Sequence, residues 1–314
     1  MTVLHLVVAR STELAPGIRE LALADPDGRP LPSHPAGSHL VVECGPVRNA
    51  YSLTGPGAAP AEYTIAVLCR PDRRREHSGA AYLHALRPGD RVCASPPRSA
   101  FAPVSTARRH LLVAGGIGVT PMVAHVRDAQ RWGRDVALLY VHRPGAGVFS
   151  DELATRLGPE LFRTTDRGAF GRRLADALTA QPLGTHLYVC GPGGFTDRVL
   201  AEASAAGWVP QRLHAERFVA AEPAPGRAFV ARLARSGRDV AVPGGTSLLD
   251  ALAAAGVVVP SLCRRGFCGE CRVPVLAGAP LHRDEYLDPD ERAAGDAVMC
   301  CVSRSETDTL ELDL

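Results

Sequence analysis

Three cysteines within nine residues constrain this chain more than any other feature of its sequence. They lie in the segment PSLCRRGFCGECRVPV, residues 260–275, with the spacing C-x4-C-x2-C, and a fourth candidate follows after 29 intervening residues. This spacing is typical of a plant-type 2Fe-2S cluster, and the glycines between the cysteines allow the backbone to approach the sulfides. The fold must therefore bring distant cysteines to one site. The predicted ligands are Cys263, Cys268, Cys271 and Cys301.

The fourth ligand has to be chosen from the adjacent pair Cys300 and Cys301. If this stretch is extended, neighbouring side chains point to opposite faces, so only one of the two can be a ligand. Cys301 completes the plant-type spacing, and Cys300 is then a packed small hydrophobic residue. A zinc site is the main alternative, although zinc sites usually combine C-x2-C with a second close pair.

The rest of the sequence indicates the cellular compartment of the protein and the kinds of partner it can bind. The sequence has no run of 18 apolar residues, and its N-terminus lacks the basic start and apolar core of a signal peptide. We therefore expect a cytoplasmic protein, in which close-spaced cysteines bind metal rather than form disulfides. The net charge of +2 gives no electrostatic footprint for nucleic acid. We expect a monomer without a membrane or nucleic-acid partner.

Two proline-rich segments, near residues 94–110 and 219–229, divide the sequence into three parts. Residues 1–103 contain short β-rich runs separated by turn residues, which predicts an antiparallel barrel or sandwich. Residues 104–222 alternate apolar strands with helical segments, which predicts an α/β domain with a parallel sheet. Residues 227–314 begin with a predicted hairpin and a helix that Thr246 or Ser247 can cap, and the cysteines follow.

The middle part carries a candidate nucleotide-binding loop. In LLVAGGIGVTPM, residues 111–122, a predicted strand runs into glycines and then into a helix. Gly116 and Gly118 allow close approach of a pyrophosphate to the free N–H groups of the helix start. A second predicted strand ends in Cys190-Gly191-Pro192, at the sheet edge where α/β proteins bind ligands. The alternatives are an ordinary tight turn and a buried cysteine.

The segments GGIGVTP and CGPGGF, followed by the cysteine motif, resemble the phthalate dioxygenase reductase group of the ferredoxin-NADP reductase superfamily over essentially the full chain. The resemblance implies an FMN-binding β-barrel, an NADH-binding α/β domain and a C-terminal α+β ferredoxin domain of the β-grasp type. It also implies electron transfer to a partner oxygenase component. The residues implied to bind the nicotinamide nucleotide are Gly115, Gly116, Gly118, Thr120, Pro121, Cys190, Gly191 and Pro192.

The family's flavin motif, R-x-Y-S, has an altered counterpart here in VRNAYSLTG. Tyr51 and Ser52 match the motif, but Arg48 precedes the tyrosine by three positions and would face away on a regular strand. Either a bulge restores the direction of Arg48, or Asn49 takes the place of the arginine.

A second family motif, G-S-x-x-L-H, occurs as GAAYLH at residues 79–84, with Ala80 in place of the phosphate-binding serine. Ser78, or the arginines at 73–75, could neutralise a flavin phosphate beside Gly79. Val67 is also predicted to contact the flavin. The resemblance implies FMN as the flavin, with FAD less favoured, while these departures leave open which groups bind the flavin phosphate.

A flavin is required on chemical grounds, because NADH delivers two electrons as a hydride while a 2Fe-2S cluster accepts one. In LHAERF, Glu216 and Phe218 match a family segment that returns to the flavin, and Glu216 would handle a proton or position the cofactor. The predicted catalytic residues are Ser52, Cys190 and Glu216. We expect an NADH-dependent oxidoreductase that serves a Rieske-type oxygenase. The alternatives are a cytochrome P450 partner and a redox sensor without turnover.

Overall fold

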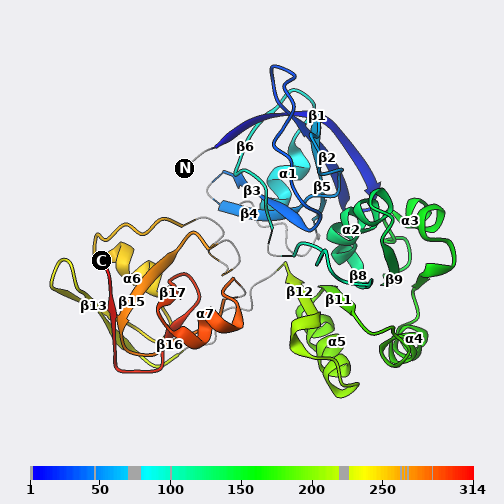
Figure 1. Cartoon of the computed structure of the whole chain (residues 1–314). Coiled ribbons are helices and arrows are strands. Elements are labelled where there is room, and N and C mark those ends of the chain that lie inside the picture. The colour runs from blue at the N-terminus through cyan, green and yellow to red at the C-terminus, as the bar shows by residue number, and fades with distance from the viewer. Residues whose placement is uncertain are drawn as a thin grey trace. The chain divides into compact units, whose positions relative to one another are not determined.

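The computed structural model describes residues 3–45, 47–69, 79–99, 101–218, 226–261, 264, 266, 269–284 and 286–314. The chain divides into two compact units, Met1–Phe218 and Val219–Leu314. Figure 1 labels the helices and strands of both units. Within the described ranges, no helix has the length and apolar character needed to cross a bilayer.

The larger unit begins with an antiparallel sheet in the order β4-β3-β6-β1-β2-β5, with β7 paired to β3. A bridge between Leu53 and Ile65 links the end of β4 to β5, so the two edges of the sheet meet. This arrangement confirms the predicted barrel. Its elements are β1 (Leu4–Ala15), β2 (Ile18–Ala24), β3 (Ser38–Cys44), β4 (Val47–Ser52), β5 (Glu62–Leu68), α1 (Gly79–Ala85), β6 (Arg91–Ala94) and β7 (Arg98–Ser99).

The second part of this unit is a five-stranded parallel sheet in the order β10-β9-β8-β11-β12. The chain starts at β8, builds outward through β9 and β10, and then returns to the other side of β8. The point between β8 and β11 is therefore the topological switch point, where α/β sheets bind ligands. The strands are β8 (Arg109–Gly115), β9 (Asp135–Val141), β10 (Leu161–Thr164), β11 (Thr185–Gly191) and β12 (Leu213–Arg217).

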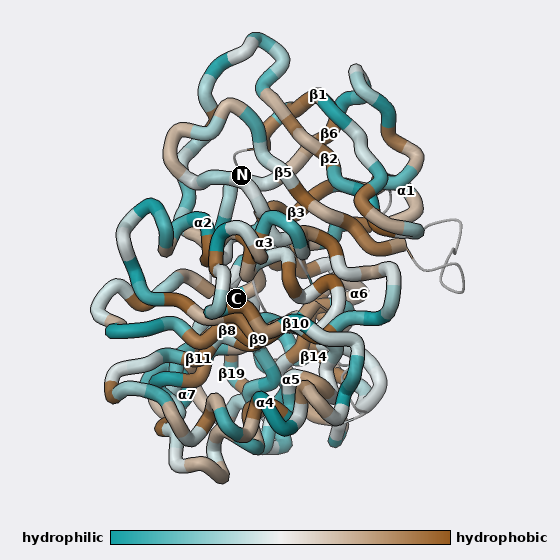
Figure 2. Tube along the Cα trace, turned by 90° about the vertical axis from the view of Figure 1, so that its right-hand side faces the viewer, coloured by the Kyte–Doolittle hydropathy of each residue, from teal (hydrophilic) through white to brown (hydrophobic). Residues whose placement is uncertain are grey.

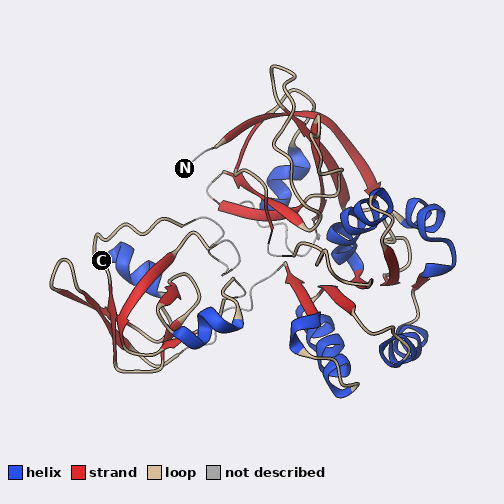
Figure 3. Ribbon diagram, in the orientation of Figure 1, coloured by secondary structure: helices blue, strands red, loops and turns tan. Residues whose placement is uncertain are grey.

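Helices cover both faces of the parallel sheet, as Figure 3 shows in blue and red. On one face, α2 (Val119–Arg131) and α3 (Ser150–Leu157) share a core with Leu112, Leu138 and Tyr188. On the other face, α4 (Arg167–Thr179) and α5 (Gly193–Ala205) pack against Leu111 and Val113. Burial on both faces explains the continuous apolar runs of the strands, visible as brown segments at β8 and β9 in Figure 2.

The barrel packs against the α2 face of this sheet. Ile18 and Phe101 belong to the same buried cluster as the helix, and Leu14 and Leu68 pack on its edge. The barrel and the α/β part of the larger unit therefore share an apolar interface.

The smaller unit contains a five-stranded mixed sheet in the order β14-β13-β19-β15-β17. The Ser247 hydroxyl accepts a 3.0 Å hydrogen bond from the Asp250 N–H and caps α6, as predicted. Helix α6 buries Leu248 and Leu252 in the core of the sheet, which agrees with the predicted β-grasp fold. The elements are β13 (Phe229–Leu233), β14 (Arg238–Val242), α6 (Leu248–Ala254), β15 (Arg272–Ala277), β16 (Pro280–Leu281), α7 (Pro289–Ala294), β17 (Ala297–Met299), β18 (Arg304–Ser305) and β19 (Thr309–Leu312).

Candidate functional site

Strand β4 settles the direction of the altered flavin motif. It pairs with β3 in continuous register from Cys44 to His39, with no bulge. Arg48 therefore points to the opposite face from Tyr51, and its guanidinium donates to Glu43 at 2.9 Å. Arg48 and Tyr51 thus lie on opposite faces of β4, because an unbroken strand alternates its side chains.

Asn49 lies on the same face as Tyr51, in the place left by the arginine. Both side chains lie against Gly79, the first residue of α1: a Cβ there would be 2.0 Å from Asn49 Nδ2 and 3.1 Å from the Tyr51 hydroxyl. The Asn49 amide nitrogen lies 3.4 Å from that hydroxyl. Of the two alternatives from the sequence, the geometry favours Asn49.

Ser52, at the end of β4, connects the barrel to the parallel sheet. Its buried hydroxyl donates a 3.1 Å hydrogen bond to Oε2 of Glu216 on β12. Glu216 pairs in parallel register with Cys190, the penultimate residue of β11. The three predicted catalytic residues thus meet at one edge of the sheet, although they come from three distant segments.

Burial controls the protonation of this group. It raises the pKa of Glu216 to about 8, against a smaller opposing effect of the Ser52 hydrogen bond. Burial also raises the pKa of the Cys190 thiol well above its usual range, and the nearby Glu216 adds to the effect. At neutral pH both side chains are therefore protonated and uncharged. A carboxyl group in this state can donate or hold a proton.

The nucleotide loop follows β8 as predicted. Gly116 has φ +57°, a left-handed conformation that favours glycine. Gly118 lies directly against the neighbouring strand end, since a Cβ there would be 2.3 Å from the Cys190 carbonyl oxygen. The buried Thr120 hydroxyl donates to the Ile117 carbonyl at 3.0 Å, so it stabilises the loop itself. Pro121 is buried in the first turn of α2.

Phe195 is a site residue that the sequence analysis missed. A Cβ on Gly191 would lie 2.6 Å from its ring, and a Cβ on Gly115 would lie 3.0 Å from it. The ring therefore packs beneath both glycines and brings the two strand ends together. The only available signal was the last letter of CGPGGF. Pro192 precedes α5 as its N-cap residue.

The other residues predicted to contact the flavin lie in or beside the apolar cores, or outside the described residues. Val67 is buried in the barrel core, and its carbonyl oxygen lies 2.8 Å from Nε2 of His84. The predicted flavin contact of Val67 stays a prediction. Ala80 lies at the edge of the barrel core, and Phe218 packs against the α2 core. Ser78 and the arginines at 73–75 lie outside the described residues.

Two of the predicted cluster ligands, Cys271 and Cys301, are described and buried. The Cys300 N–H donates to the Cys271 carbonyl at 3.1 Å, which brings the two cysteine segments together. Cys300 is packed in the core and burial raises its pKa. Cys300 and Cys301 lie in a turn after β17 rather than on an extended strand. The premise of the strand argument was therefore wrong, and the choice of Cys301 rests on the cysteine spacing.

The loop between the ligands has the glycines that such a cluster needs. Gly266 and Gly269 have φ +77° and +75°, and a Cβ on Gly269 would lie 2.2 Å from the Tyr286 ring. Cys263 and Cys268 lie outside the described residues, and the described part alone contains no group of three metal-ligating side chains. The buried thiols and the left-handed glycines fit a 2Fe-2S cluster.

A closed barrel beside a parallel sheet with a glycine loop at its switch point, together with a β-grasp unit, defines the class of flavin and nicotinamide-nucleotide reductases that carry a ferredoxin domain. Two family models match the chain. "2Fe-2S iron-sulfur cluster binding domain" matches residues 231–306, and "Dimethylamine monooxygenase subunit DmmA-like, N-terminal domain" matches residues 90–213.

Individual proteins match this chain over essentially its full length. The "Heme-dependent oxidative N-demethylase beta subunit" of Ectopseudomonas mendocina is 42% identical over 100% of this chain and 99% of its own. The crystal structure of phthalate dioxygenase reductase superimposes with a TM-score of 0.71 at 33% identity, over 99% of this chain and 98% of that one. An intact type IV self-sufficient cytochrome P450 monooxygenase gives a TM-score of 0.85 at 34% identity, over 99% of this chain but 41% of that one.

The chain belongs to the phthalate dioxygenase reductase-like family of oxygenase reductases. It is therefore an oxidoreductase with a flavin domain, an NAD domain and a 2Fe-2S domain, and this confirms the family predicted from its motifs.

Proposed function

We propose that this protein is the NADH-dependent reductase of an oxygenase system and that hydride enters where Ser52, Cys190 and Glu216 meet. The observation that carries the proposal is the hydrogen bond from Ser52 to Glu216. It joins the strand of the flavin motif to the carboxyl edge of the parallel sheet, beside the nucleotide loop. A flavin bound there supplies the conversion from a two-electron donor to one-electron steps.

Each residue has a distinct part in the proposed site. Tyr51 and Asn49 form one wall of the flavin site, with the tyrosine ring providing an apolar face and the asparagine amide providing hydrogen-bond donors. Ser52 orients the Glu216 carboxyl, which holds a proton at neutral pH. The small, uncharged Cys190 leaves room for the nicotinamide ring and adds no charge near the reacting carbon.

We propose FMN as the flavin and NADH as the donor, because the family that shares these motifs uses both. The four cysteines Cys263, Cys268, Cys271 and Cys301 would hold the 2Fe-2S cluster, whose potential in plant-type proteins is roughly −400 mV. The partner would dock near the 2Fe-2S domain of a monomeric, cytoplasmic reductase.

The proposed partner is a Rieske-type oxygenase, the partner class expected from the sequence motifs; the full-length structural relative phthalate dioxygenase reductase is named for a dioxygenase. The second candidate is an oxygenase that uses haem as its cofactor, such as a cytochrome P450. It is favoured by the full-length similarity to the subunit of a haem-dependent oxidative N-demethylase and to the reductase part of a P450 fusion. Reconstitution with each oxygenase class, scored as NADH-dependent product formation, decides between them.

The first test is the anaerobic absorption spectrum of the purified protein before and after addition of NADH. We expect overlapping flavin and iron-sulfur bands that bleach with NADH, and acid extraction should release FMN. Cluster bands without a flavin, or bands that NADH leaves unchanged, would contradict the proposal. Release of FAD would correct only the identity of the flavin.

A further inference from the structure

Arg127, on the second half of α2, crosses from the NAD part to the barrel. Its Nη1 donates to the carbonyl oxygen of Thr54. Thr54 is completely buried and lies two residues after Ser52. Its N–H donates to the Thr64 carbonyl at 2.9 Å, and its hydroxyl is 2.7 Å from the Thr64 hydroxyl. The bond from Arg127 therefore ends on a rigid part of the barrel, beside the proposed flavin strand.

Glu152 of α3 holds the Arg127 guanidinium in this direction. Nε and Nη2 of the arginine donate to the two carboxylate oxygens of Glu152, each at 2.8 Å. Nη1 is left for Thr54. Glu152 also accepts a 2.7 Å bond from Nε of Arg156, which fixes the carboxylate. A planar guanidinium can make these three contacts at once, whereas a lysine ammonium cannot reproduce the bidentate pair.

Helix α2 links this contact to the nucleotide loop. Its N-terminal end follows Gly118, which packs against the Cys190 carbonyl. One continuous helix of 13 residues therefore connects this loop to Arg127. Arg127 and Glu216 thus hold the NAD part to two neighbouring residues of the barrel, the backbone carbonyl of Thr54 and the side-chain hydroxyl of Ser52.

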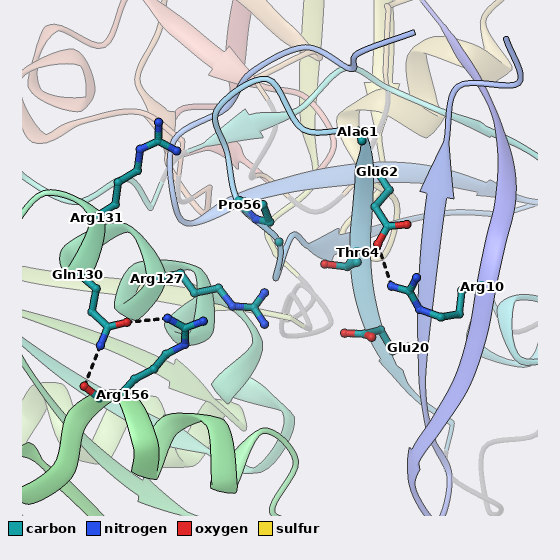
Figure 4. Close-up of a pocket in the computed structure, with 11 residues that line it drawn as sticks. Arg10, Glu20, Pro56, Ala61, Glu62, Thr64, Arg127, Gln130, Arg131 and Arg156 are labelled. Atoms are coloured by element: carbon teal, nitrogen blue, oxygen red, sulfur yellow. Dashed lines mark hydrogen bonds and ion pairs between the residues drawn. The ribbon is translucent and has the colours of Figure 1, made fainter. Parts of the chain in front are cut away.

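The interface around Ile18 and Phe101 also joins the two parts. It is mostly apolar and hence non-directional, but Nε2 of His125 on α2 lies 2.9 Å from the Phe101 carbonyl oxygen within it. Arg127 adds a second polar contact from the same helix, nearer to the proposed flavin strand. Next to Arg127 the two parts are separated by an open cleft of about 920 Å³. Figure 4 shows Arg10 and Glu20 on its barrel side, and Arg127, Arg131 and Arg156 on its helical side. Across this cleft, the hydrogen bond from Arg127 to Thr54 gives directional contact.

We propose that Arg127, held by Glu152 and bonded to Thr54, is a positioning residue that sets the angle at which the NAD domain presents the nicotinamide to the flavin. This inference rests on the proposed function. Hydride transfer requires the reacting atoms to be close and aligned, and a misplacement of 1 Å can reduce the rate by roughly 100-fold. NADH binding depends on the nucleotide loop and does not require the Arg127 contact.

The test is stopped-flow reduction of the flavin by NADH in the full-length holoprotein. For Arg127→Met, we expect the limiting reduction rate to fall at least about 10-fold and the nicotinamide-flavin charge-transfer absorbance to weaken, while the Kd for NADH stays within about two-fold. Glu152→Gln should reduce the rate in the same direction, and Arg127→Lys should restore only part of it. The matched control is Arg131→Met, one turn later on the same helix, which should leave the rate unchanged.

An unchanged limiting rate in Arg127→Met, or an equal loss in Arg131→Met, would overturn the inference. If Arg127→Met fails to retain its flavin, Glu152→Gln and Arg127→Lys decide the question, and normal rates in both reject the positioning role. A wild-type protein whose flavin is not reduced by NADH would instead reject the proposed function itself.

Discussion

The raised pKa of Glu216 should lower the free energy of unfolding as the pH rises. Its pKa is raised from 4.5 to about 8, mainly by burial, so the folded state retains a proton that the unfolded chain loses above about pH 4.5. Stability then falls between about pH 4.5 and 8 and is constant above that range. One pKa unit corresponds to about 1.4 kcal/mol, so the complete shift represents at most about 5 kcal/mol.

The side chain is only partly shielded from solvent, so we expect about half of that upper bound, roughly 2 to 3 kcal/mol. The perturbation is Glu216→Gln, which keeps the shape and a hydrogen-bond acceptor for Ser52 but cannot ionise. The assay is urea unfolding of both proteins at pH 5 and pH 9. The two free energies of unfolding should nearly coincide at pH 5, and the glutamine variant should be the more stable at pH 9. A difference that does not change with pH would refute the reasoning.

Three further predictions concern the flavin site, the cluster and a buried histidine. Asn49→Ala should weaken flavin binding at least about 10-fold, by loss of about 1.5 kcal/mol of hydrogen bonding, whereas Arg48→Ala should leave the affinity unchanged. Fluorescence titration of the apoprotein with FMN measures both affinities. Weaker binding in Arg48→Ala than in Asn49→Ala would contradict the strand geometry. Cys301→Ser should abolish the iron-sulfur absorption bands, whereas Cys300→Ser should retain them. Loss of the bands in Cys300→Ser alone would show that Cys300, and not Cys301, is the fourth ligand. Burial lowers the pKa of His125 to about 3, so stability should decrease as the pH falls below about 6.5, by up to about 3 kcal/mol at pH 4. A His125→Gln variant with the same acid-unfolding midpoint as the wild type would show that another group is responsible.

These predictions address different links between structure and function. The flavin and cluster variants test which side chains bind a cofactor. Glu216 and His125 test the free energy that burial adds to the ionisation of single groups. The Arg127 experiment tests whether the orientation of two packed domains limits the rate of hydride transfer.

Local rules were sufficient for much of the molecule. The spacing of the cysteines, the glycine loop after β8 and the cap of α6 depend on neighbouring residues, so they could be read from short segments. The strict alternation of side chains along β4 already placed Arg48 opposite Tyr51. The assumption that Cys300 and Cys301 lie on an extended strand was wrong, because both lie in a turn.

The sequence by itself therefore determined the order of the three parts, the strand patterns of the first two and the residue types available for a cluster and a nucleotide, because these follow from periodicity and spacing. The β-grasp fold of the third part was implied by the family resemblance. Only the tertiary structure decided which groups meet. Ser52 reaches Glu216 across 164 positions, and Arg127 reaches Thr54 across 73. No local pattern encodes such contacts, since they depend on how the barrel packs on α2 and on the strand order of the parallel sheet. The raised pKa of Glu216 has the same origin, because desolvation acts on a carboxyl group only after distant segments have enclosed it.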